Sequence, residues 1–286
     1  MCFNSAHPYS NFASVIIKQI IMDVNNFNQQ LDELFKTWME SYPEDQRNLF
    51  CQDGLMLKAD KSIDVNDLWR KAQRRVAFIL KDNPDGWGND TRLWLQDAKN
   101  ADILGNRFLT TLAEILYALL HLDATEDSRL KLCYNKIHGA LRQNVADNFI
   151  NTAPFAFIEA KKLAGGKTVS QREMSEAMER DCEYLKQELG ILRPNIIVCF
   201  DRYNSQFNFI TRRYFGDKEA QVIEYDYTDE SGRKLIGQRC CLWYYPDDNV
   251  VVIRSYHPSY GALWKTFERV VSPFHAFLKR HPEVKF

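Results

Sequence analysis

Four short apolar runs, separated by long helical stretches, constrain the fold of this chain more than any other feature. The runs lie at residues 76–80, 154–160, 195–200 and 248–256. Apolar runs of this length without alternation are typical of strands that are buried on both faces. When helices connect such strands, the strands form a parallel sheet that is covered by helices on both faces. We therefore predict an α/β fold, a three-layer α/β/α sandwich with a central four-stranded parallel sheet.

The remaining patterns divide the chain into two parts. Residues 23–41 carry apolar side chains on one helical face, and residues 42–66 are mixed and polar. We predict a helical N-terminal segment over residues 1–69 and one α/β/α domain over residues 70–286. The other expected elements are helices at 90–142, a helix from the capping box of Ser170 and Glu173 to about Gly190, a helix at 203–214, a β-rich stretch at 220–245, and a helical tail interrupted at Pro273.

Composition excludes several classes of protein. The chain has 286 residues, of which 45% are hydrophobic and 26% charged, as in ordinary globular proteins. Its net charge of −1 does not indicate a protein that covers long nucleic acids or an anionic membrane surface. The basic pair Arg212-Arg213 is a local exception, for which a solvated face is the simpler interpretation. No window of about 18 apolar residues is present, so we expect no membrane association.

Cysteine usage indicates reduced thiols. The chain has seven cysteines, an odd number, at irregular spacing and without a C-x-x-C pair. This pattern argues against a disulfide framework and against a zinc site. We therefore expect a cytoplasmic protein without a metal.

Polar turns follow the first and the last of the predicted strands. Asp82-Asn83-Pro84 comes after the first strand, and His257-Pro258-Ser259 comes after the last. Parallel strands joined by right-handed crossovers end at one edge of the sheet, where ligands of α/β proteins bind. We therefore expect the two turns to meet in one crevice.

Three segments, in this order, resemble the uracil-DNA glycosylase superfamily. They are FILKDNPDGWG after the first strand, EMSEAMERDCEYLKQELGILRPNIIVCF before and within the third, and SYHPS after the last. The resemblance covers residues 75–280, and the helical insert at 100–145 matches less well. It implies a uracil-DNA glycosylase-like fold that hydrolyses the N-glycosidic bond of a damaged, uracil-type base in DNA.

The resemblance also implies catalytic roles. His257 would donate a hydrogen bond to the departing base, which carries negative charge in the transition state. Asp82 or Asn83 would orient water and stabilise the positive sugar. Trp87 would stack on a base that has been flipped out of the duplex or that lies in a single strand.

Further contacts follow from the same motifs. Ser259, Tyr260 and Leu263 match the loop that contacts and enters DNA in the family. Glu159, at the end of the second strand, stands where the family has an asparagine that reads the base. An ionised glutamate only accepts hydrogen bonds, so a base with an amino group would suit Glu159 better than uracil. Cys182 matches one of four cluster cysteines in one branch, and the other three are missing, so we expect no cofactor.

Simpler interpretations stand beside these roles. His257-Pro258 and Asn83-Pro84 are also ordinary turn sequences. Trp87, Tyr260 and Leu263 are also suitable core residues, and Glu159 can pair with the lysines at 161 and 162 in a solvated cluster. Two other functions therefore remain open: an inactive nucleic-acid- or nucleotide-binding protein on the same fold, and hydrolysis of a free nucleoside. In each case we expect a monomer.

Overall fold

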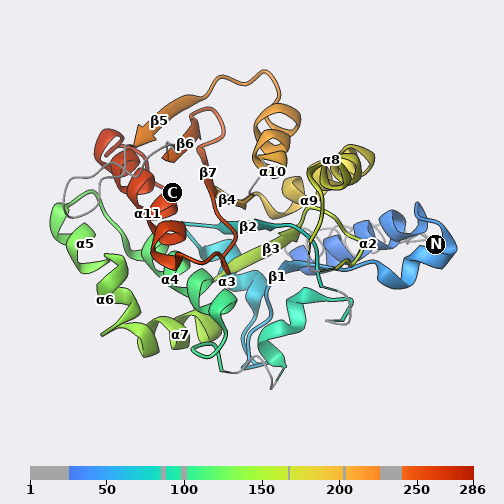
Figure 1. Cartoon of the computed structure of the whole chain (residues 1–286), viewed down its shortest axis with the longest axis horizontal. Coiled ribbons are helices and arrows are strands. Elements are labelled where there is room, and N and C mark those ends of the chain that lie inside the picture. Colours follow the sequence, from blue (N-terminus) through green and yellow to red (C-terminus); the bar gives the residue numbers. More distant parts are fainter. Residues whose placement is uncertain (1–25, 85–87, 98–101, 167, 202–203, 226–239) are drawn as a thin grey trace, which may run out of the picture.

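The computed structural model describes residues 26–84, 88–97, 102–166, 168–201, 204–225 and 240–286 (Figure 1). Its centre is a seven-stranded sheet in the order β1-β3-β2-β4-β7-β6-β5. The strands are β1 (Gly54–Leu55), β2 (Val76–Leu80), β3 (Phe155–Glu159), β4 (Ile196–Phe200), β5 (Gln221–Tyr225), β6 (Cys240–Tyr245) and β7 (Val250–Ser255).

The four predicted strands are confirmed, and they pair in parallel as β3-β2-β4-β7. The prediction of a sheet with four parallel strands is nevertheless wrong, because the sheet is mixed. β1 joins β3, β6 joins β7 and β5 joins β6, each in the antiparallel direction. β1 has only two residues, too few for a recognisable pattern, and β5 lies at the margin with much of its surface exposed.

Helices cover both faces of the sheet, because successive residues of the central strands point to opposite sides. Phe78, Phe157 and Ile253 pack on one side, and Ala77 and Ile158 on the other. Figure 1 shows these helical layers on the two sides of the sheet. The first side carries α4 (Arg107–His121), α6 (Tyr134–His138), α7 (Arg142–Asn151) and α11 (Leu263–Arg280), and the second carries α2 (Phe27–Glu40), α3 (Val65–Lys71), α8 (Gln171–Arg180), α9 (Cys182–Leu192) and α10 (Ser205–Phe209).

Shorter elements connect these layers. They are the 3₁₀ helices η1 (Glu44–Leu49) and η2 (Thr91–Gln96), the helix α5 (Glu126–Lys131), and the π-helical turn η4 (Ile210–Tyr214), which continues α10. Within the described residues, no helix combines the length and the apolar character needed to cross a membrane.

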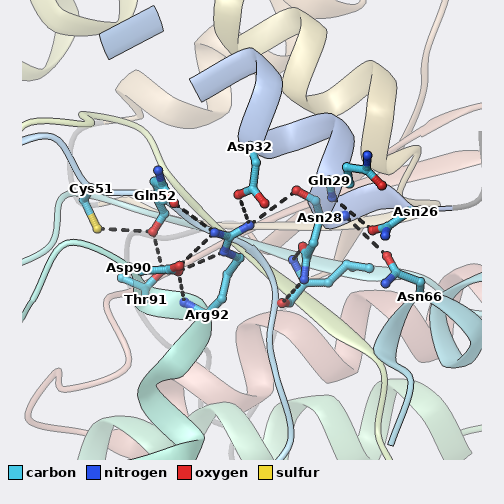
Figure 2. Close-up of polar contacts among 11 residues, drawn as sticks. Asn26, Asn28, Gln29, Asp32, Cys51, Gln52, Asn66, Asp90, Thr91 and Arg92 are labelled. Atoms are coloured by element: carbon cyan, nitrogen blue, oxygen red, sulfur yellow. Dashed lines mark hydrogen bonds and ion pairs between the residues drawn. The ribbon is translucent and has the colours of Figure 1, made fainter. Parts of the chain in front are cut away.

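The described part of the N-terminal segment, from residue 26 onward, shares the sheet and the core. α2 packs on α9, where Trp38 stacks on Tyr184 with ring centroids 5.2 Å apart. Figure 2 shows a second link, in which Arg92 of η2 contacts Asp32 of α2 at 2.8 Å and Asp90 at 2.7 Å. The segment is therefore attached to the sheet by both packing and ion pairs.

Two local predictions are wrong. The helix expected from residue 170 to about Gly190 is divided at Asp181, whose carboxylate accepts a hydrogen bond from the Tyr42 hydroxyl at 2.6 Å. The last helix is not interrupted at Pro273 but runs through it. Neighbours of this proline such as Val270 and Phe274 are fully buried, and their packing outweighs the backbone hydrogen bond that proline removes.

Candidate functional site

The candidate site lies at the edge where the parallel strands end. Asp82 follows β2, Glu159 is the last residue of β3, and His257 follows β7. The strand ends are in register, because Leu80 pairs with Glu159. The charges of Lys81 and Asp82 act on the pKa of both His257 and Glu159. The polar turns predicted to meet are therefore within electrostatic reach of one another.

The His257 ring is neutral and carries its proton on Nε2. The Ser259 N–H donates to Nδ1 at 3.2 Å, which requires a lone pair on that nitrogen. The ring also lies against Phe108, with centroids 5.7 Å apart. The residue is exposed at its outer side, but the protein around the ring lowers the pKa of His257, and the positive charge of Lys81 lowers it further. The result is an imidazole whose Nε2–H can donate to a ligand at neutral pH.

Asp82 is held by two lysines. Its carboxylate is 1% exposed and lies 2.5 Å from Lys81 Nζ and 3.1 Å from Lys161 Nζ. Lys161 Nζ also donates to the Leu163 carbonyl at 2.8 Å, so the ion pair fixes the loop after β3. A Cβ on Gly165 would lie 2.4 Å from Asp82 Oδ2, so the loop approaches the carboxylate as closely as glycine permits. Both carboxylate oxygens of Asp82 are therefore at ion-pair distance from a lysine, but Oδ1 has no hydrogen-bond partner among the described residues.

Asn83 retains a free acceptor. The residue is fully buried, and its Nδ2 donates to the Gly88 carbonyl at 2.6 Å. Its Oδ1 has no hydrogen-bond partner in the described part of the chain. Each of the two residues expected to orient water therefore has one buried oxygen without a hydrogen-bond partner among the described residues, and Asp82 adds a fixed negative charge.

Glu159 is a buried carboxyl group in a strongly perturbed environment. The residue is 1% exposed, and its backbone N–H donates to Asp53 Oδ2 at 2.6 Å. Burial raises the pKa of Glu159 to about 8, with a further contribution from the Asp53 charge. The carboxyl is thus protonated at neutral pH, and its Oε2 has no partner among the described residues. Burial therefore favours the neutral carboxyl, which both donates and accepts hydrogen bonds, over the ionised form expected from the sequence.

Glu159 does not form the solvated cluster with the two following lysines. Lys161 pairs with Asp82, and Lys162 is fully buried between Asp53 at 2.5 Å and Glu188 at 2.9 Å. The buried ion pair of Asp53 with Lys162 was not predicted from the sequence. A sequence signal for the lysine is its place three residues after a buried strand, with no Gly, Pro, Asn or Asp between them.

The residues expected to contact DNA differ in exposure. Tyr260 is 47% exposed, and its ring stacks on Tyr256 with centroids 4.6 Å apart. Ser259 is exposed beside the imidazole, whereas Leu263 is half-buried at the start of α11. Trp87, the expected stacking residue, lies outside the described residues.

Neither a metal site nor a match to a known protein assigns a further role to the candidate site. Within the described residues, no group of three or more histidine, cysteine or acidic side chains could hold a metal ion. Cys182, the cysteine that matches the iron–sulfur branch, is a free thiol. The chain matches no protein-family model and no curated protein.

Proposed function

We propose that this site hydrolyses the N-glycosidic bond of a damaged, uracil-type base in DNA. The observation that carries the proposal is the placement, at the same edge of the parallel strands, of His257, whose Nε2–H can donate, and of the buried Glu159 carboxyl with its raised pKa. Further support comes from the resemblance of three motifs to the uracil-DNA glycosylase superfamily and from the parallel order of the three strands, β2, β4 and β7, that carry them.

The reaction breaks the bond between the sugar C1′ and the base nitrogen, and the base keeps the electron pair. His257 Nε2–H donates a hydrogen bond to the base oxygen on which negative charge develops. The fixed Asp82 carboxylate stabilises the positive charge on the sugar, and Asn83 Oδ1 accepts a hydrogen bond from the attacking water. Water adds to C1′ and loses a proton, which balances the charge of the released base.

Base recognition follows from the protonation state of Glu159. A neutral carboxyl both donates and accepts a hydrogen bond, whereas a carboxylate only accepts. The lactam edge of uracil presents a carbonyl beside an N–H, so it complements the neutral carboxyl. This favours a uracil-type base over a base that presents an amino group.

Excision of the base tests the proposal. Single-stranded DNA with one uracil is incubated with the protein and then treated with hot alkali, which breaks the strand at abasic sites. We expect breaks with the wild type and a loss of about 100-fold or more in rate with His257→Ala. The control is His121→Ala, a surface histidine on α4. The absence of breaks with every deaminated or alkylated base tried would overturn the proposal.

A second candidate function is binding without cleavage. It is favoured by the ion pairs between Asp82 and two lysines, whose positive charges offset the negative charge that would stabilise a sugar cation. Under this alternative, uracil-containing DNA is retained by the protein and stays intact after alkali treatment, and His257→Ala leaves the rate of strand breakage at background.

A further inference from the structure

A polar groove runs between two helices that the proposed chemistry does not use. It has a volume of about 420 Å³ and separates α8 from α10 and its continuation η4. Gln171, Ser175 and Glu179, four residues apart, line one wall. The opposite wall carries Ser205, Asn208, Arg212 and Arg213, and Met178 and Phe209 complete the lining.

Most of the polar groups that line this groove can donate hydrogen bonds: they are hydroxyl, amide and guanidinium groups. Glu179 is the one acidic residue among the described lining residues, and both of its oxygens accept from Arg213, each at 3.0 Å. Arg212 is exposed and has no ion pair or hydrogen bond within the described residues. Among these residues, the groove therefore carries one positive charge without a paired carboxylate.

Both walls are anchored at the candidate site. At the start of α8, Glu173 lies 3.6 Å from Lys161, which in turn pairs with Asp82. In α10, Gln206 donates to the Leu80 carbonyl at 2.7 Å, directly before the Lys81-Asp82 turn. The helices that form the groove are therefore connected to the turn that carries Asp82.

The two arginines lie on a π-helical turn. Phe215 N–H donates to the Ile210 carbonyl at 3.0 Å, five residues back, in place of the usual spacing of four. Such single turns cost helix stability and occur frequently at functional sites. The turn brings Arg212 and Arg213 to the rim of the groove.

We propose that this groove binds the sugar-phosphate backbone of the nucleic-acid strand that passes through the candidate site. Phosphodiester oxygens accept from guanidinium, hydroxyl and amide donors, which are the groups present. A chain with a net charge of −1 lacks a general attraction for DNA, so phosphate contacts must come from a local site. The choice of ligand rests on the proposed function, but the test measures binding alone.

The test uses fluorescence anisotropy with a labelled single-stranded oligothymidylate that contains no damaged base. We expect Arg212→Ala to weaken binding about fivefold at moderate salt and to reduce the slope of log affinity against log salt by about 0.7, the value for one phosphate contact. The matched control is Arg172→Ala, which removes the same charge from α8. Arg172 pairs with Glu176 at 2.7 Å and does not line the groove.

A second variant tests the groove without removing a charge. Ser175→Glu places a carboxylate on the exposed wall opposite Arg212, and we expect it to weaken oligothymidylate binding at least as much as Arg212→Ala. Equal affinities for wild type, Arg212→Ala and Ser175→Glu would overturn the proposal. Competition by inorganic phosphate at the same phosphate concentration as the oligonucleotide would also overturn it, because it would indicate a small-anion site.

The two proposals fail separately. If no base is excised but binding depends on Arg212 and not on Arg172, the groove assignment stands and the glycosylase proposal falls. If uracil is excised and Arg212→Ala binds as the wild type does, the glycosylase proposal stands and the groove assignment falls.

Discussion

At the scale of single residues, the protonation state of Glu159 determines which hydrogen bonds its carboxyl can form. The side chain is buried at the end of β3 beside Asp53, and both conditions disfavour its charged form. Below a pH of about 8 the group is neutral and can donate a hydrogen bond to a base carbonyl. Above it, the carboxylate repels that carbonyl.

This difference predicts the alkaline limb of the pH profile. We expect excision by the wild type to fall as the pH rises through about 8. Glu159→Gln, which is neutral at every pH and presents both a donor and an acceptor, should keep its activity over the same range. The measurement is kcat/KM on uracil-containing DNA from pH 6 to 9.5. Identical alkaline limbs for the two proteins would contradict the role assigned to Glu159.

A second residue-scale prediction concerns two adjacent glycines. A Cβ on Gly165 would lie 2.4 Å from Asp82 Oδ2 and 2.7 Å from Lys161 Nζ, whereas a Cβ on Gly166 meets nothing within 4 Å. We expect Gly165→Ala to displace the buried ion pair and to cost about 1–3 kcal/mol of unfolding free energy. Gly166→Ala should change it by less than about 0.5 kcal/mol. Urea unfolding measures the free energy of unfolding of both variants. Equal values would contradict the close approach of Gly165 to the Asp82 carboxylate.

At the scale of elements, one guanidinium connects α2, η2 and the chain before β1. Arg92 is 6% exposed and contacts Asp90, Asp32 and Gln52, the last at 2.9 Å (Figure 2). Its removal leaves Asp90, which is largely buried, without a counter-charge. The network therefore fixes how the N-terminal helix sits on the rest of the chain.

We expect Arg92→Met to lower the free energy of unfolding by about 2 kcal/mol, less than for a fully buried pair because Asp32 is half exposed. The control is Arg70→Met on α3, which breaks an exposed pair with Asp67 and should cost less than about 0.5 kcal/mol. Chemical denaturation measures both. A loss no larger for Arg92→Met than for Arg70→Met would show that the network adds no stability.

The central strands could be predicted from sequence, and several other elements could not. β2, β3, β4 and β7 are continuous apolar runs because helices cover both of their faces, and burial on two sides leaves a clear signal. The break at Asp181 depends on Tyr42, which lies 139 residues away, so no local pattern reports it.

The same limit applies to the candidate site. The topology predicts that His257 and Asp82 meet, but the raised pKa of Glu159 comes first from its burial and then from the charge of Asp53, which is 106 residues distant.

At the scale of the whole molecule, a buried lysine links stability to pH. Lys58 is 1% exposed, and its Nζ donates to the Ala153 carbonyl at 2.5 Å near the end of α7. Burial lowers the pKa of Lys58 to about 7. Between that value and its ordinary pKa near 10.5, the unfolded chain binds a proton that the folded protein does not. Stability from this group therefore rises with pH over that interval.

We compare the free energy of unfolding of the wild type with that of Lys58→Met. From pH 7.5 to 9.5, we expect the wild type to gain stability relative to the variant by about 1 kcal/mol per pH unit. The comparison cancels the titration of other groups, which both proteins share. Urea titrations at several pH values measure it. A difference that does not vary with pH would show that Lys58 keeps an ordinary pKa in the folded protein.

The order of strands in the sheet has a consequence for how the chain is made. β2 lies between β3 and β4, and β4 borders β7, which is followed by His257. The ribosome synthesises these segments one after another. β2 therefore has no strand partner until β3 and β4 emerge, 75 or more residues later. Until residues 250–257 have left the exit tunnel, one flank of β4 is unpaired and able to associate with other chains. A chain that has been synthesised only as far as β4 therefore lacks both a partner for this strand and His257, and it has an aggregation risk.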